Sequence, residues 1–292
     1  MKYLIFTDVS ADLDAQYASD NNVHFIPMEY SLGDDMRLCK GPEGVEIMKK
    51  FYDGQRNGDM TKTSQISPYM YQQHFSPYME QGYSILYFCL SSGLSSTFQS
   101  ALVAKAELKE EYPEVDLYPI DTLAATGGMG VLVEKAVLYR DKYNYSVEEN
   151  YTKMVEHTKE ILHWFMVEDL MYLKRGGRLS AATAIAGTAL GVKPILRIDK
   201  KGMLINIAKK RGVKSAISEL VEKFKASEPA VSEDDVIYIV HADAEENAEL
   251  LKEKILEIYP DVKIKTSYLT PIIGAHTGPG MVAVCHLGAD WA

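Results

Sequence analysis

The sequence predicts an α/β protein of two domains, a parallel-sheet α/β domain at residues 1–150 and an α+β domain at residues 151–292. Three observations support this fold class. Strand-like and helix-like segments alternate in the first half, which is typical of a parallel sheet covered by helices. The second half contains two strand-like runs around a Lys-Gly pair, which indicates a hairpin. Apolar residues make up 47% of the chain, enough for a sizeable core, and we expect the ligand site between the two domains.

In the first half, short apolar runs predict strands and a period near 3.6 residues predicts helices. The helix expected at 67–82 has serine at its start and glycine at its end. The predicted strands lie at 3–8, 23–30, 84–90 and 115–121, and the predicted helices at 44–54, 67–82, 96–112 and 123–142.

The second half mixes strands and helices without a strict alternation, and no repeat or low-complexity linker separates it from the first. A segment of small residues, 180–191, follows a pair of glycines. The predicted helices lie at 146–161, 168–177, 212–227 and 244–260, and the predicted strands at 162–167, 194–202, 203–211, 236–243, 262–270 and 281–288.

Charge and composition exclude several classes of protein. The formal net charge is −10 and no Lys/Arg-rich run is present, so nucleic-acid binding is not expected. Cys39, Cys89 and Cys285 lie far apart, and we expect reduced, buried thiols in a cytoplasmic protein. The N-terminal apolar run is short and Asp8 follows it, unlike a signal peptide, and no stretch has the length of a membrane span.

The stretch SSGLSSTFQSA at residues 91–101 follows a predicted strand and opens a predicted helix. A helix N-terminus at the carboxyl edge of a parallel sheet presents unpaired amide donors and the positive end of the helix dipole, which favours an anion. Alternatively, Ser95, Ser96 and Thr97 only cap the helix. A catalytic serine is less favoured, because the nucleophile elbow GxSxG requires a glycine where this chain has Thr97.

Two further segments carry candidate hydrogen-bonding residues. TKTSQISP at residues 61–68 places hydroxyl groups, among them Thr63 and Ser64, ahead of a helix, where they serve either as caps or as donors to a ligand. A carboxylate accepts up to about four hydrogen bonds, so such a ligand needs several converging donors. GAHTGPG at residues 274–280 predicts a tight glycine-rich loop that presents His276, and the alternative is a turn with an incidental histidine.

Other glycine-rich and basic segments fit structural roles. DTLAATGGMG at residues 121–130 lacks the GxGxxG spacing, so its glycines favour close helix packing. In LKRGGRLS, residues 173–180, the glycines predict a helix C-terminus at which Lys174 and Arg175 complement the dipole, whereas Arg178 lies beyond it. The histidines show no paired-ligand spacing and no P-loop is present, so we expect neither a metal site nor a cofactor.

Taken in order, these motifs resemble those of the DegV family. The resemblance spans almost the whole chain, and its specificity comes from the set of motifs rather than from any one of them. The motifs are TDVSADL at 7–13, VHFIPMEY at 23–30, KTSQISP at 62–68, SSGLSSTFQSA at 91–101, DTLAATGGMG at 121–130, VEDLMYLKRGGRLSAATAIAGTALGVKPIL at 167–196 and GAHTGPG at 274–280.

The resemblance implies two α/β domains that hold a long-chain fatty acid between them. It further implies that the chain is not itself an enzyme but presents the fatty acid to a separate fatty acid kinase, which forms an acyl phosphate for phospholipid synthesis. The acyl chain would occupy an apolar tunnel. The side chains on which we expect the shape of this tunnel to depend include Ile26, Met28, Leu94, Ile161, Phe165, Ile185 and Leu190.

Carried over to this chain, the family pattern makes Thr63 and Ser95 the first carboxylate ligands and His276 the next. The resemblance also suggests Ser64 and Ser96 as neighbours of the carboxylate. Arg178 would belong to the same hydrogen-bond network or contact the kinase. The expected site therefore comprises Thr63, Ser64, Ser95, Ser96, Arg178 and His276.

The chain departs from the family pattern at three places. Val9 stands where members usually have serine, Ile66 replaces a proline, and residues 36–44 lack the usual acidic and glycine pattern.

Two other functions compete with the expected one. The first rival is a serine esterase or thioesterase that uses Ser95 and His276. The second is a binder of a small phosphorylated or sugar ligand at the same helix N-terminus.

Overall fold

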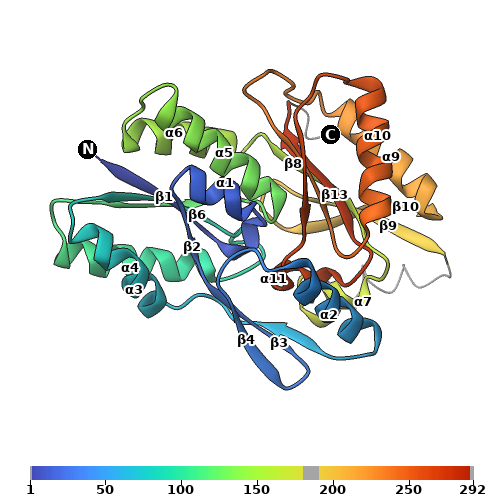
Figure 1. The fold of residues 1–292 in the computed structure, drawn as a ribbon, viewed down its shortest axis with the longest axis horizontal. Helices are drawn as coiled ribbons and strands as arrows, with labels where there is room; N and C mark the ends of the chain where they lie inside the picture. The colour runs from blue at the N-terminus through green and yellow to red at the C-terminus, as the bar shows by residue number, and fades with distance from the viewer. Residues whose placement is uncertain (1, 180–190, 290–292) are drawn as a thin grey trace.

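The computed structural model describes residues 2–179 and 191–289, and most of the predicted segment of small residues at 180–191 lies outside them. The described elements form a parallel sheet in the N-terminal part, a mixed sheet in the C-terminal part and a small third sheet (Figure 1). This confirms the predicted α/β class with a parallel sheet followed by an α+β part.

Within the described residues, the first sheet contains four parallel strands in the order β2-β1-β6-β7. Figure 1 shows α3 and α4 on one side of it and α5 and α6 on the other. The predicted division at residue 150 falls inside α6, which packs against α5, β6 and β7. The bounds are β1 Tyr3–Asp8, β2 Val23–Ile26, β6 Ser84–Cys89, β7 Leu117–Asp121, α3 Pro68–Met79, α4 Thr97–Glu111, α5 Gly127–Asp141 and α6 Val147–His157.

The second sheet has the order β10-β9-β8-β13-β11-β12, with β11 and β12 as its parallel pair. The hairpin predicted around Lys-Gly is confirmed as β9 and β10. Helices α9 and α10 pack on the face of the sheet opposite α5. The bounds are β8 Ile161–Met166, β9 Val192–Ile198, β10 Leu204–Arg211, β11 Ile237–His241, β12 Ile264–Tyr268, β13 Val282–Leu287, α9 Val213–Ala226 and α10 Glu245–Ile258.

The third sheet, antiparallel in the order β4-β3-β5, was not predicted. The strand expected at 23–30 is divided at Pro27, which has no N–H group to donate, and its two parts join different sheets. The remaining short elements surround this sheet or follow β1. Their bounds are β3 Met28–Leu32, β4 Asp35–Cys39, β5 Thr61–Thr63, η1 Val9–Ala11, α1 Ala15–Asp20, α2 Val45–Arg56, α7 Met171–Arg175 and α11 Pro271–Thr277.

Helix α5 lies between the first two sheets and touches both. It begins at Gly127, four residues later than predicted. A Cβ on Gly128 would lie 1.9 Å from Nε2 of His163 on β8, and one on Gly127 would lie 2.6 Å from Cβ of Tyr238 on β11. These contacts confirm that the glycines of DTLAATGGMG serve close packing, since any side chain would push the helix off the second sheet.

Two buried carboxyl groups lie at the end of the first strand and just after it. Asp8 accepts hydrogen bonds from the backbone N–H of Leu90 at 3.0 Å and from the hydroxyl of Tyr87 at 3.2 Å. Asp12 accepts one from the backbone N–H of Thr270 at 2.7 Å, and a short one from the hydroxyl of Thr126. Asp12 therefore connects the start of α5 with the start of α11, which lie far apart in the sequence.

We expect Asp12→Asn to change the pH dependence of folding. Burial raises the pKa of Asp12 from 3.8 to about 7, so the folded protein retains a proton that the unfolded chain releases near pH 4. The proton contributes on the order of 4 kcal/mol to the free energy of unfolding. This contribution is fully present below about pH 4 and is lost as the pH rises to about 7. Urea unfolding should therefore show that the wild type loses stability relative to the variant across this range. Parallel curves for the two proteins would contradict the assignment.

Candidate functional site

A cavity of about 490 Å³ lies between the N-terminal elements and the second sheet. Its walls combine two chemical characters. Apolar side chains include Leu90, Phe165, Leu173, Leu204, Met281 and Ala283. Polar side chains include all six residues expected at the site, namely Thr63, Ser64, Ser95, Ser96, Arg178 and His276.

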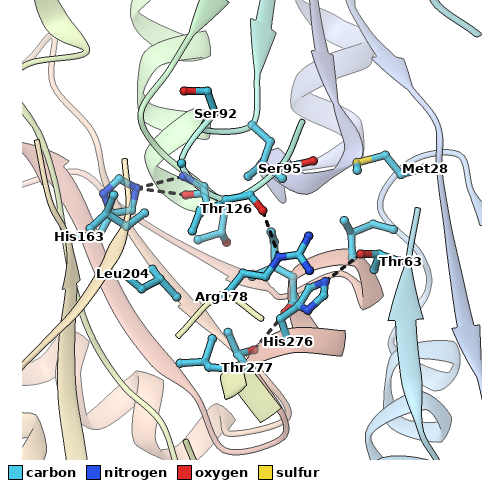
Figure 2. A pocket seen from close by; sticks show the side chains of 18 of the residues that line it. Met28, Thr63, Ser92, Ser95, Thr126, His163, Arg178, Leu204, His276 and Thr277 are labelled. Carbon is cyan, nitrogen blue, oxygen red and sulfur yellow. Dashed lines mark hydrogen bonds between the residues drawn. The ribbon is translucent and has the colours of Figure 1, made fainter. Parts of the chain in front are cut away.

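Figure 2 shows His276 pointing toward Thr63, and its Nε2 lies 2.8 Å from the Thr63 hydroxyl. The prediction that a tight loop presents this histidine was wrong, because His276 lies in the last turn of α11. Pro271 occupies the first turn of this helix, and Gly278 ends it with a φ of 73°. His276 therefore has a helical backbone, which restricts the directions in which its ring can point.

Thr63 ends β5, and Ser64 follows it at the mouth of the cavity. The next helix, α3, is capped by Ser67, whose hydroxyl accepts the N–H of Met70 at 3.2 Å. Thr63 and Ser64 are therefore not the caps of this helix. Thr61, two residues earlier, donates to the carbonyl of Ala275 at 2.9 Å, which ties β5 to the helix that carries His276.

The loop between β6 and α4 brings Ser95 to the cavity (Figure 2). Its hydroxyl oxygen accepts the backbone N–H of Thr97 at 3.2 Å and lies 2.8 Å from the Thr97 hydroxyl. Ser96 is the N-cap residue, yet its side chain makes no capping bond. The capping interpretation therefore holds in part for Ser95, whose hydroxyl still faces the cavity.

The beginning of the same loop has a structural role. The Ser91 hydroxyl donates to the carbonyl of Gly202 in the β9–β10 turn at 2.8 Å. A Cβ on Gly93 would lie 2.6 Å from the carbonyl carbon of Gly202, so only glycine permits this contact. Ser91 and Gly93 thus hold the turn of the second sheet against the first, which the sequence did not reveal.

Arg178 connects the two sides of the cavity. Its Nε donates to the carbonyl of Leu94 at 3.0 Å (Figure 2), and Nη1 makes a short bond to the carbonyl of Gly176. The basic residues Lys174 and Arg175 lie in the last turn of α7, which confirms the predicted helix C-terminus. Arg178 has a different role, since it fixes the loop that carries Ser95.

Burial keeps the two cavity histidines neutral. The pKa of His276 is lowered to about 4, first by burial and then by the nearby positive charge of Arg178. Burial lowers the pKa of His163 to about 3. His163 lies deep in the cavity, where its Nε2 is 3.2 Å from the carbonyl oxygen of Ala125 (Figure 2). Both rings therefore act near neutral pH as uncharged hydrogen-bonding groups.

The geometry differs from that of a serine hydrolase. A hydrolase requires a histidine that is hydrogen-bonded to the serine and oriented by a carboxylate. Here His276 pairs with Thr63, whereas Ser95 pairs with Thr97. In the described part of the chain, Nδ1 of His276 has no hydrogen-bond partner, so no carboxylate orients it.

Sequence reasoning found part of the cavity wall. Of the side chains expected to shape the tunnel, Met28, Leu94 and Phe165 line the cavity. Ile26 and Ile161 are buried in the core instead, and Ile185 and Leu190 lie outside the described residues. His163 and Thr126 were missed. The only sequence signal for His163 was a polar residue inside an otherwise apolar strand.

The structure also describes the cysteines, the apolar character of the helices and the grouping of possible metal ligands. Cys39, Cys89 and Cys285 are free and buried, which confirms the prediction of buried, unpaired cysteines. Across residues 2–179 and 191–289, no helix has the length and apolar character needed to cross a bilayer. In the same ranges, no three His, Cys, Asp or Glu side chains are grouped as metal ligands.

We expect His276 to remain neutral between about pH 5 and pH 8 and to become protonated only near its lowered pKa of about 4. The measurement is an NMR titration of the imidazole resonances, assigned with a His276→Asn variant. The exposed ring of a free histidine titrates near 6.5, which provides the reference. A midpoint for His276 close to that reference would mean that the ring is solvated rather than buried.

Comparisons with known proteins match this architecture over nearly the whole chain. A sequence model of the DegV family, a family of uncharacterised proteins, matches residues 2–288. A DegV domain-containing protein of Clostridium perfringens is 37% identical over 287 residues, which cover 98% of each chain. The structure of DegV from Bacillus subtilis, named a fatty acid-binding protein, is 30% identical, with a TM-score of 0.79 and 99% of each chain covered.

A DegV family protein from Thermus thermophilus, solved in connection with fatty acid binding, is also similar. It is 26% identical with a TM-score of 0.85, and the likeness covers 99% of this chain and 100% of that one. The matches extend over both sheets and include every motif on which the resemblance rested. This chain belongs to the DegV family.

Proposed function

We propose that this protein binds a long-chain fatty acid, with the carboxylate at Thr63, Ser95 and His276 and the acyl chain along the apolar walls. The observation that carries the proposal is the division of one cavity into two characters. Hydroxyl groups and the neutral imidazole of His276 line one part of it, whereas Phe165 and Ala283 contribute buried apolar wall. The DegV relative from Bacillus subtilis is described as a fatty acid-binding protein, which agrees with this proposal.

Two opposing energies decide whether such a ligand stays bound. Burying an acyl chain gains about 0.8 kcal/mol per CH₂, roughly 10 kcal/mol gross for a long chain before the costs of association. Removing the carboxylate from water is unfavourable unless hydrogen bonds replace the lost hydration. Thr63, Ser95 and the N-terminus of α4 supply donors and a positive dipole end at one place, and Arg178 adds a nearby charge.

The rival functions fit the cavity less well. The esterase interpretation requires a bond between Ser95 and His276, and each of these residues pairs with a different threonine. A sugar or a small phosphorylated ligand would leave the apolar walls without an apolar partner, so these walls would contribute nothing to its binding. We therefore retain the small polar ligand only as an outcome of the experiment.

The first test is mass spectrometry of an organic extract of the purified protein. We expect about one long-chain fatty acid per chain. Thr63→Val and Ser95→Ala should each weaken binding about 10- to 100-fold, because a hydrogen bond to a charged group contributes about 1.5–3 kcal/mol. Ser215→Ala, an exposed position on α9, is the matched control and should bind as the wild type does.

Two results would contradict this proposal. A wild-type protein that carries no fatty acid and rejects added fatty acids would exclude it and would favour the polar-ligand interpretation. Labelling of Ser95 by a fluorophosphonate probe would favour the esterase interpretation instead.

We further propose that the protein works in the cytoplasm and presents the bound carboxylate to a fatty acid kinase without catalysing the transfer itself. The family resemblance implies this role. The exposure of the lining residues agrees with it, because Gln65 and Ser96 are exposed whereas Phe165 and other apolar residues of the wall are buried. A partner could therefore reach the carboxylate while the acyl chain stays inside.

A reconstituted reaction tests this role. With ATP and a purified fatty acid kinase, the loaded protein should yield acyl phosphate, which hydroxylamine traps as the acyl hydroxamate. The protein alone should yield none. Equal rates with free fatty acid and with the loaded protein would show that no presentation is needed, and product without the kinase would show that the chain is an enzyme.

A further inference from the structure

Two adjacent glycines end α7, and the backbone explains only one of them. Gly177 has a φ of 75°, and its N–H donates to the carbonyl of Lys174 at 3.0 Å, as in a helix that ends with a left-handed residue. Gly176 has a φ of −70° and a ψ of −11°, which any residue adopts. Something other than backbone conformation therefore requires glycine at position 176.

The ring of His276 meets this requirement. A Cβ on Gly176 would lie 2.3 Å from Nδ1 of His276, 3.2 Å from Cε1 and 3.3 Å from Cγ. The nearly equal distances to the two carbons flanking Nδ1 place this point on the outward bisector of the ring angle at Nδ1. A point above the ring would be closer to both carbons, so the Cβ position lies in the ring plane.

In this direction Nδ1 points either its lone pair or, in the other tautomer, its hydrogen. The Cα–H bond of Gly176 that a Cβ would replace points toward this position. A lone pair there makes a weak Cα–H···N contact, related to the Cα–H···O contacts of sheets. A hydrogen on Nδ1 would instead be directed at a C–H bond, which accepts no hydrogen bond. Among the described residues, Nδ1 has no other partner that would favour a hydrogen at this atom.

We propose that Gly176 is a positioning residue for the binding site, because it holds His276 in the tautomer that carries its hydrogen on Nε2. The Nε2–H group then donates to the Thr63 hydroxyl oxygen, 2.8 Å away. The hydroxyl hydrogen of Thr63 is left to donate into the cavity, toward the carboxylate of a ligand. This inference rests on the proposed fatty acid binding and adds to it the direction of the hydrogen bonds.

The opposite tautomer would reverse this direction. Nε2 would accept the hydrogen of Thr63, and the Thr63 oxygen would present only lone pairs to the ligand, which repel a carboxylate. Burial of His276 and the charge of Arg178 keep the ring uncharged, so the two neutral tautomers are the relevant alternatives. Gly176 thus decides whether Thr63 acts as a donor or as an acceptor.

Affinity measurements with a matched pair of glycine variants test the proposal. Gly176→Ala should weaken fatty acid binding at least about tenfold, because the methyl group displaces the ring from Thr63. Gly177→Ala is the control. A Cβ at this position meets no atom within 4 Å, so the variant strains the helix end without touching the ring and should bind within about twofold of the wild type. Melting curves of both variants establish that they are folded.

A double variant separates an effect through His276 from general damage. In a His276→Asn background, which has no ring at this place, adding Gly176→Ala should cost no further affinity. An unchanged affinity of the Gly176→Ala single variant, or an equal loss in Gly177→Ala, would overturn the proposal. So would a full additional loss in the His276→Asn background.

The tautomer itself is read by ¹⁵N NMR of the histidine rings in the wild-type protein, a measurement that needs neither a variant nor a ligand. The expected spectrum shows a protonated Nε2 and an unprotonated Nδ1 for His276. A protonated Nδ1 overturns the inference even if fatty acid binds. A protein with the expected tautomer that binds no fatty acid would instead refute the proposed function and leave the positioning role of Gly176 intact.

Discussion

The hydrogen bonds to Asp12 hold together the parts of the chain that enclose the cavity. Its carboxylate accepts from Thr126 at the start of α5 and from Thr270 at the start of α11, and its carbonyl accepts from Ser267 at 2.5 Å. Helix α11 carries His276. Without these bonds, a buried carboxylate would lose its donors and the histidine would lose its fixed distance from the first sheet. The geometry of the site thus depends on a residue that does not line it.

The sequence predicted the elements that have strong periodicity and missed those that have none. Both large sheets and their long helices follow from apolar runs and helical spacing. The third sheet could not be predicted, because β5 has three residues and four of the five residues of β4 are exposed, so no alternation marks either strand. The break between β2 and β3 at Pro27 could have been predicted from the sequence, since proline has no N–H group to donate to a neighbouring strand.

Site residues on separate motifs could be listed from the sequence, but their arrangement could not. Hydroxyl-rich motifs marked the loops around Thr63 and Ser95, and the family resemblance then selected these two residues as carboxylate ligands. The backbone around His276 was misjudged, because α11 has seven residues and the glycines nearby suggested a loop. His163 belongs to no motif, and only the three-dimensional packing of β8 against α5 places it in the wall.

Two of the departures from the family pattern have little bearing on the cavity. Val9 and Ile66 are buried in the hydrophobic core, and neither lines the cavity. Each therefore contributes apolar packing where the family pattern has serine or proline. The segment 36–44 is different, since it forms β4 and the connection to α2, and Met36 and Leu38 on it are exposed. Apart from the buried Cys39, this departure therefore concerns mainly a surface of the molecule.

In the proposed function, the polar end of the cavity would select a ligand by the number and direction of its hydrogen-bond donors. His276 is neutral, and Thr63 and Ser95 are uncharged, so apart from Arg178 the donors that face a ligand there carry no formal charge. Uncharged hydroxyl donors favour a ligand that accepts several hydrogen bonds at one end. A carboxylate can accept all of them, whereas an ester or an alcohol of the same chain offers fewer acceptor sites and would leave buried donors unpaired. Since an unpaired buried donor costs more than a formed bond contributes, we expect the proposed site to bind or reject the same acyl chain according to its head group.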